Sequence, residues 1–417
     1  MSIFKWKTFA CLMLVGACSG GAVRALPDDN GKQKPLAKPA VEAKIDAPGS
    51  RPKQTTSADS DSMGVAAPSE KDEAKRESGA GERIVAGAEQ STTASAPLAA
   101  NREPKRRAQP APLDGIFPGT DYLGPTPLIG VPDTDPVYPL TKALWSVAPA
   151  LKNARIKVYG WINPGISVST SNKSNIPESY AVVPNRVELD QGVIRIERLP
   201  DTVQTDHMDG GFRLTPIYGI DYRWTTAQGW FSGQLLNHNY LYGFDPVEVY
   251  ALLYIPNVGE GMVIKAWRYI SPPDIEAQLS PDNYLFTHSL MFTVDCYTQT
   301  GINATVKLND QWSVMAGVHA ADDIAPWNKA AHPTGMFMVR WVSKSNNDSL
   351  YGGIDSINNG KFKGGHDNLQ QFNLTWTHRF IETGTLFTTT ETYYIYQSQA
   401  LVGGTVNMVR RAGGLQT

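Results

Sequence analysis

Three acidic side chains in the middle of the chain are, by residue type, the best suited to acid–base chemistry. Asp274, Glu276 and Asp282 lie between two segments that the sequence predicts to be strands, with three prolines nearby. Paired carboxylates hydrolyse glycosidic bonds only where one has a raised pKa and the two have a defined separation. The spacing indicates neither condition, and the prolines indicate a loop. We therefore expect no enzyme activity from these residues.

Metal and nucleophile motifs are the next candidates. Among the seven histidines, no two have the close spacing of a zinc pair, and the chain contains no CxxC, no G-x-S-x-G elbow and no phosphate-binding glycine loop. Two of the three cysteines, Cys11 and Cys18, are close to the N-terminus, and for Cys296 we expect plain packing in a wall or loop. The sequence therefore predicts no catalytic residue, no metal site and no cofactor.

The balance of acidic and basic residues indicates which binding partners to expect. The 417 residues include 38 Lys+Arg and 40 Asp+Glu, which gives a formal net charge of −2. This gives no reason to expect nucleic-acid binding, which usually needs a basic excess. Charged residues make up 19% and aromatic residues 10% of the chain, with 37 glycines. Such a composition is typical of a β-rich wall facing two solvents, although a secreted β-sandwich remains open.

The N-terminal part predicts export. Lys5 and Lys7 precede the apolar run Phe9–Val15, and small residues then lead to a signal-peptidase site at Ala25, so residues 1–25 read as a signal peptide. Cys18 also fits a lipoprotein box.

Four further regions follow from composition. Residues 26–112 are rich in Ala, Pro, Ser and charge, and we expect them to be disordered. Residues 113–154 are Pro/Gly-rich, contain a short helix at about 140–151, and read as a bridge or lumen plug. The remaining chain predicts a β domain over 155–400 and an irregular tail over 401–417.

In the β domain, apolar and polar residues mostly alternate with a period of two. In Arg155–Asn163 apolar and polar side chains alternate, as expected of a strand whose two faces meet different surroundings. In Val187–Arg198 the alternation changes phase near Gly192, which predicts a β-bulge. The other predicted strands are Ile220–Thr225, Glu248–Tyr254, Met262–Ile270, Phe286–Val294, Gly301–Leu308, Gln311–Ala320, Gly335–Val342, Ser349–Ile357, Phe372–Thr377 and Leu386–Tyr396.

The charges inside these strands favour a transmembrane barrel over a sandwich. A wide barrel keeps them hydrated in its lumen and leaves an apolar outer face with aromatic girdles. We expect lipid contact from Ile156, Val158, Ile162, Tyr222, Trp224, Leu374 and Trp376, and a lumen position for Asn373. The residues expected to line the pore are Arg155, Lys157, Asp221, Arg223, Arg268, Asp274, Glu276 and Asp282.

A resemblance to a known family supports this interpretation. Ala266–Tyr284 resembles a segment of the OmpL-like second β-barrel porin family, and Tyr297–Gly301 and the acidic loop Asp322–Trp327 continue the match. Tyr242–Pro246 fits as well, and the resemblance covers roughly Lys157–Tyr396. It implies an all-β, antiparallel outer-membrane barrel of a Gram-negative bacterium, a porin in contact with outer-membrane lipid. The family carries no established catalytic residues.

Three functions are compared at this stage. The first, which the sequence favours, is a channel for passive diffusion of small polar solutes. The second is a non-conducting barrel that binds or anchors envelope polysaccharide, and the third, which the absence of catalytic motifs disfavours, is a barrel hydrolase. The three acids of the loop could fold inward and narrow a channel, opposed by Arg223 and Arg268, or could lie in an exposed loop.

The end of the chain predicts an incomplete barrel. The last convincing strand ends at Tyr396, and the tail lacks alternation and carries Arg410 and Arg411. Resembled family members continue with further strands. We expect a truncated product or a barrel completed by other chains, such as a homo-oligomer, because unpaired backbone groups in lipid cost several kcal/mol each. Closure between about Arg155 and Tyr396 is the alternative.

Overall fold

A computed structural model describes residues 128–132, 138–175, 180–272, 278–283, 285–288, 295–382, 385–402 and 405–416. The expected signal peptide and the segment 26–112 lie outside the described residues.

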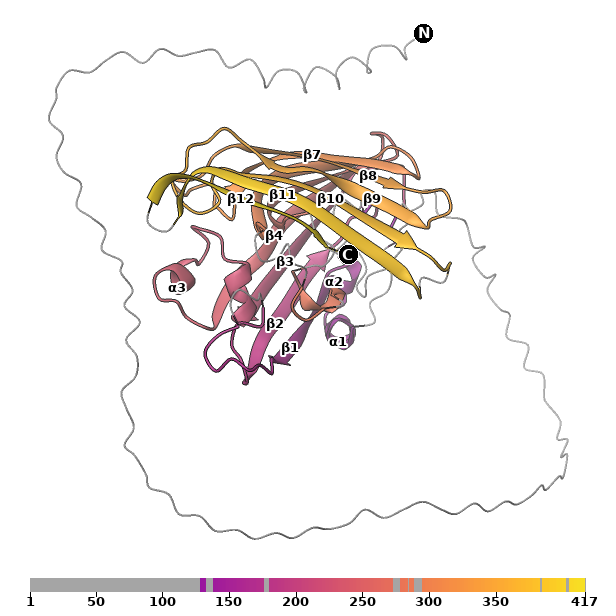
Figure 1. The fold of residues 1–417 in the computed structure, drawn as a ribbon. Helices are drawn as coiled ribbons and strands as arrows, with labels where there is room; N and C mark the ends of the chain where they lie inside the picture. Colours follow the sequence, from indigo (N-terminus) through magenta and orange to yellow (C-terminus); the bar gives the residue numbers. More distant parts are fainter. Residues whose placement is uncertain are drawn as a thin grey trace, which may run out of the picture. The chain divides into compact units, whose positions relative to one another are not determined.

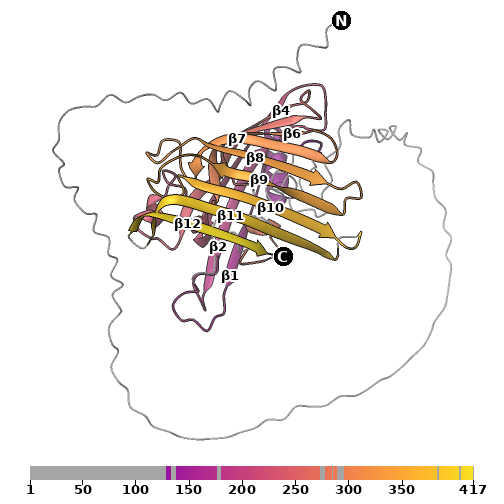
Figure 2. The same ribbon diagram turned by 45° about the horizontal axis from the view of Figure 1, so that its top comes forward.

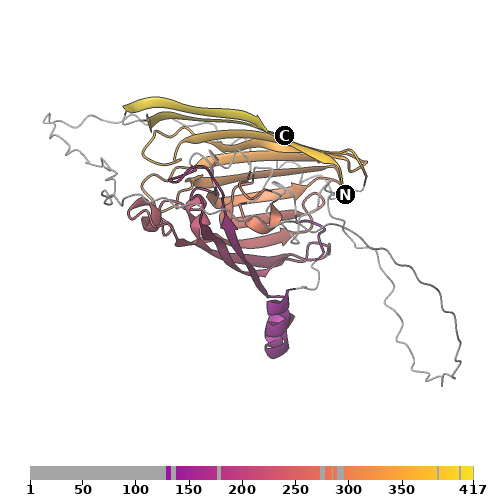
Figure 3. The same ribbon diagram turned by 60° about the horizontal axis from the view of Figure 1, so that its bottom comes forward.

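The described chain forms one antiparallel sheet of twelve strands, each hydrogen-bonded to its neighbours in sequence (Figure 1). Figures 2 and 3 show that this sheet is strongly curved. The strands are β1 (Lys157–Ile166), β2 (Val187–Arg198), β3 (Asp209–Gly219), β4 (Gly243–Ile255), β5 (Met262–Ile270), β6 (Thr298–Lys307), β7 (Trp312–Asp322), β8 (Thr334–Val342), β9 (Asp348–Ile357), β10 (Leu369–Arg379), β11 (Phe387–Val402) and β12 (Thr405–Gln416).

Five short helices accompany the sheet. They are α1 (Pro139–Val147), α2 (Pro149–Asn153), η1 (Ile220–Trp224), α3 (Gly233–Leu236) and η2 (Ser280–Asp282). The first two confirm the helix expected near residues 140–151. No helix in the described ranges is long and apolar enough to cross a membrane.

The two faces of the sheet differ in polarity as the alternating pattern predicts. In β10, Asn373 and Thr375 are buried, whereas Leu374 is 43% and Trp376 39% exposed. In β1, Lys157 is 6% and Ile162 77% exposed. In these two strands apolar side chains face outward and polar ones inward, which is the inverse of a water-soluble sandwich and the pattern of a membrane barrel. The inner face also buries apolar side chains, such as Leu252 and Tyr254 of β4.

Helix α1 covers the outer edge of β1. The Thr141 hydroxyl donates to the Val158 carbonyl over 2.5 Å and accepts from the Val158 N–H over 3.0 Å, and the Trp145 indole donates to the Ile156 carbonyl over 2.7 Å. Side chains of α1 therefore partner backbone groups that a further strand would otherwise bond, which protects an edge. Figure 3 shows α1 beyond β1.

The described strands form an open sheet. β1 pairs with β2, β12 pairs with β11, and no pairing joins β1 to β12 in the described ranges. The expectation of an irregular tail over 401–417 was wrong, because β12 continues the ladder from Thr405 to Gln416. Two arginines and two glycines obscured its period in the sequence.

The segment after β3 corrects a second expectation. Ile220–Trp224 is a 3-10 helix and not a strand, and the strand lies just before it. Gly219 ends β3 with φ 153°, and a Cβ there would come 2.1 Å from the Asp190 carbonyl oxygen, so the chain leaves the sheet at a position only glycine fits. Tyr222 is consequently buried and does not face outward.

Two smaller expectations have different outcomes. The β-bulge lies at Asp190, where the register with β1 shifts, two residues from the predicted Gly192. The predicted strand Phe286–Val294 is wrong for Phe286–His288, which form a turn, and its remaining residues lie outside the described ranges.

The polarity of the outer face predicts a position-dependent cost of charge. Leu374→Arg, at the middle of β10, should lower the free energy of unfolding in phospholipid vesicles by about 2–4 kcal/mol, because a midplane charge is costly. Ile381→Arg, just beyond the same strand and 45% exposed, is the matched control and should cost about 0–1 kcal/mol. Equal costs in denaturant titrations would show that the outer face of β10 does not meet hydrocarbon.

Candidate functional site: the buried polar face

The buried polar face of β2–β4 carries a neutral ladder of two arginines and two glutamates. Arg195 donates to Glu248 over 2.9 Å, and Arg213 donates to Glu197 over 2.8 Å and to Glu248 over 3.4 Å. The Thr215 hydroxyl adds a 2.6 Å bond to Glu248. All four charged side chains are at most 3% exposed. Their charges cancel within the protein, as buried charges must if water does not solvate them.

Aromatic residues of β1 complete this ladder. The Tyr159 hydroxyl donates to Glu197 over 2.8 Å, and the Arg195 guanidinium lies 5.9 Å from the Tyr159 ring centroid and 5.5 Å from that of Trp161. Such cation–π contacts hold a guanidinium flat against a ring face. Tyr138, before α1, stacks on Tyr159 with centroids 4.0 Å apart.

A second ion pair joins β4 and β5. Both terminal nitrogens of Arg268 contact the Asp245 carboxylate, at 2.7 and 2.9 Å, and one of them also donates to the Thr225 carbonyl over 2.7 Å. The Trp230 ring lies 5.1 Å from the guanidinium. Arg268 is fully buried, and Asp245 neutralises its charge.

The connection from β5 to β6 folds against this polar face. Gln191 of β2 accepts a bond from the Ser280 N–H and donates to the Gln278 carbonyl, both at 3.1 Å. Asn163 of β1 donates to the Ser280 hydroxyl over 2.8 Å. Figure 1 shows η2, in orange, beside β1 and β2. The stem of the loop that carries the three acids is therefore anchored on the buried face.

Two titratable groups outside the strands line the same region. Asp221 of η1 accepts a 2.8 Å bond from Gln191, and burial raises the pKa of its carboxyl well above the usual range. His288 stacks on Tyr180 with centroids 3.6 Å apart, and burial lowers the pKa of its imidazole to about 4. His288 is therefore neutral near neutral pH.

The residues expected to line the pore lie in different parts of the structure. Lys157 and Arg268 are buried on the polar face, and Arg155 pairs with Asp209 at 2.5 Å beside it. Asp221 and Arg223 belong to η1, where Arg223 contacts Asn239 and the Tyr240 carbonyl. Asp282 ends η2, while Asp274 and Glu276 lie outside the described residues.

A third group, around Cys296, was not foreseen. The Cys296 thiol lies 3.3 Å from Asp355 Oδ2, and Gln299 Nε2 donates to Asp355 over 3.1 Å and to Asp322 over 3.3 Å. The Ser356 hydroxyl donates to Asp322 over 2.6 Å. These residues come from three strands and the segment before β6, so no local pattern in the sequence could have joined them.

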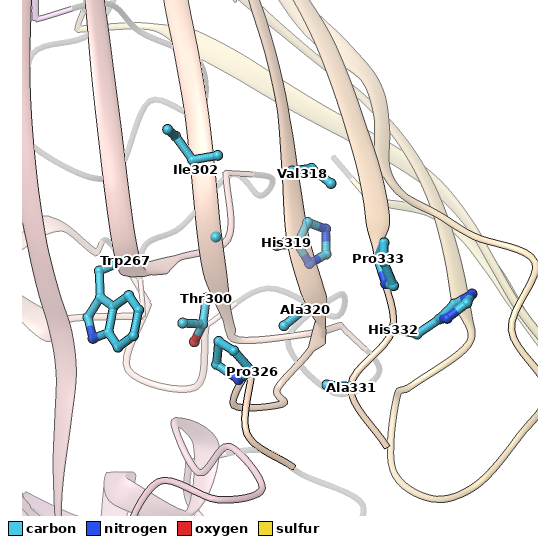
Figure 4. Close-up of a pocket in the computed structure, with 11 residues that line it drawn as sticks. Trp267, Thr300, Ile302, Val318, His319, Ala320, Pro326, Ala331, His332 and Pro333 are labelled. Atoms are coloured by element: carbon cyan, nitrogen blue, oxygen red, sulfur yellow. The ribbon is translucent and has the colours of Figure 1, made fainter. Parts of the chain in front are cut away.

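The opposite, apolar face carries a groove of about 530 Å³ at one end of β5–β7 (Figure 4). Its outward side chains include Trp267, Ile302 and Val318, each 45–48% exposed, with Pro326 and Pro333 at its rim. Trp267 also packs against Trp230 and Trp327, and tryptophan clusters at strand ends are typical of a membrane interface.

The comparisons with known proteins agree with this architecture. The family described as "Putative beta-barrel porin-2, OmpL-like" matches residues 155–412, more than half of the chain. The chain belongs to this family. The resemblance expected from the sequence is thereby confirmed. No curated protein and no solved structure matches the chain.

The arginine–glutamate ladder of this porin-family chain predicts unequal costs for two arginine substitutions. Arg213→Met should lower the free energy of unfolding by about 3–5 kcal/mol, since it leaves buried glutamate charge unpaired. Arg198→Met is the control: Arg198 is 26% exposed, and its partner Asp209 keeps a second arginine, Arg155, so the cost should stay below about 1 kcal/mol. Similar losses in urea titrations would contradict a dry, charge-balanced ladder.

Proposed function

We propose that the protein is an outer-membrane channel for the passive diffusion of small polar solutes. The observation that carries this proposal is one curved antiparallel sheet with an apolar outer face, whose ion-paired arginines and glutamates are buried on the inner face. Lipid accepts the apolar face, and a lumen accepts the polar face. Membership of a porin family supports the same assignment.

The anchored loop stem supports a narrowed lumen. Because Gln278–Ser280 bonds to β1 and β2, the loop that carries Asp274, Glu276 and Asp282 starts from the polar face. We infer that these acids lie near the narrowest part and set ion preference, as charged rings do in other pores. The crossed-charge arrangement with Arg268 is not part of this proposal, because Asp245 already neutralises that arginine.

Release of the loop should enlarge the channel. Gln191→Leu removes the anchoring bonds to Gln278 and Ser280, and we expect a larger single-channel conductance in planar bilayers. Gln311→Leu is a matched control, since its amide bonds the Val342 carbonyl in a distant hairpin. A folded wild-type protein that does not conduct would refute the channel and favour a barrel that binds envelope polysaccharide.

Neutralising the loop should change selectivity without closing the pore. In the combined variant Asp274→Asn, Glu276→Gln and Asp282→Asn, we expect the reversal potential in a salt gradient to shift toward anion preference. The physical reason is the loss of fixed negative charge near the narrowest section. Asp310→Asn, in an exposed turn, should leave the reversal potential unchanged. Identical potentials for the combined variant and wild type would place the three acids away from the ion path.

A further inference from the structure

The group around Cys296 differs from the arginine–glutamate ladder of β2–β4 in its charge balance. Asp322 and Asp355 are both fully buried, and no lysine or arginine in the described ranges forms an ion pair with either. Asp322 Oδ2 and Asp355 Oδ1 also have no hydrogen-bond partner among the described residues. Elsewhere on this face the buried carboxylates of Glu197 and Glu248 are matched by arginines. Two buried carboxylates without a protein cation indicate that something else offsets them.

The geometry of the group suits a cation. One ligand atom each from Cys296, Asp322 and Asp355 lie within 4.8 Å of one another. His319 of β7 lies beside these three residues: it is 3% exposed, and its Nδ1 is 3.7 Å from Asp322 Oδ1. Neither ring nitrogen of His319 makes a close hydrogen bond to a described residue, although the backbone of Ala321 and of Asp355 lies near the ring.

We propose that Cys296, Asp322, Asp355 and His319 bind one divalent transition-metal ion of the zinc class. A thiolate, an imidazole and two carboxylate oxygens form a mixed sulfur, nitrogen and oxygen donor set, which suits a borderline-soft ion and not Mg²⁺ or Ca²⁺. Binding replaces the proton of the Cys296 thiol, which leaves to solvent.

Two neighbours hold the carboxylates in place for this role. Gln299 donates to Asp355 Oδ2 and to Asp322 Oδ1, and Ser356 also donates to Asp322 Oδ1. The second oxygen of each carboxylate, Asp355 Oδ1 and Asp322 Oδ2, makes no hydrogen bond to a described residue. Such outer partners orient metal ligands. Because Cys296 precedes β6 while the other ligands belong to β7 and β9, the ion would join the end of the β5–β6 connection to the wall. This role goes beyond solute diffusion and does not depend on it.

Cobalt provides the direct test. The folded full-length protein, freed of metal by a chelator, is titrated with Co²⁺, and we expect one equivalent to produce the near-ultraviolet thiolate-to-cobalt charge-transfer band. Cys296→Ser should abolish the band, whereas Cys11→Ser and Cys18→Ser should retain it. Ser356→Ala should weaken binding by about 10-fold to 100-fold, the usual effect of losing an outer partner.

A control variant at Asp348 and an elemental analysis of the wild-type protein complete the test. Asp348→Asn removes a carboxylate that also contacts a histidine, His378, at 2.7 Å, and should leave the titration unchanged. If Cys296→Ser does not fold, elemental analysis of wild-type protein from zinc-supplemented cells decides, and we expect one zinc per chain. Failure of wild type to bind Co²⁺ or zinc stoichiometrically, or a cobalt band unchanged by Cys296→Ser, would overturn the proposal, whatever the conductance shows.

Discussion

Every backbone N–H and C=O group of a strand that faces hydrocarbon must find its hydrogen-bond partner within the protein, because lipid offers none. In the described ranges the sheet meets this constraint by pairing each strand with its sequence neighbours, except along the outer edge of β12, which pairs with no further strand there. At the outer edge of β1, Thr141 and Trp145 supply side-chain partners in place of a strand. The backbone hydrogen bonds between strands thus define the sheet, and the sheet determines the face toward which each side chain points.

Because side chains alternate between the two faces of the sheet, each face has its own polarity. Residues on one face meet an apolar exterior, so the polar residues gather on the other face, where they must satisfy one another. Arg195 and Arg213 do so with two glutamates, and Arg268 does so with Asp245. The surroundings of Cys296 follow a different rule, with acids in excess. The proposed channel and the proposed cation site at Cys296 would account for both arrangements.

The sequence predicted the fold class and most strands, because a period of two survives wherever neither glycine nor proline interrupts it. It missed β3, whose residues include three glycines and Pro216, and instead assigned a strand to the alternating but helical Ile220–Trp224. The sequence placed Lys157 and Arg268 on the inner face of strands. It did not identify the residues that they contact, such as Asp245 for Arg268. The Cys296 group was beyond its reach, since Cys296 and Asp355 are brought together only by the sheet register and the path of the loop.

The central claim is that the two faces of one sheet meet different solvents, and fluorescence quenching by lipid tests it most directly. Single cysteines are placed in turn at residues 372–376 of β10 in a protein without its native cysteines, labelled, and reconstituted with bromine-labelled lipid. The account predicts quenching with a period of two, strong at Phe372, Leu374 and Trp376 and weak at Asn373 and Thr375. Uniform quenching along β10, or strong quenching at Asn373 and Thr375 alone, would contradict it.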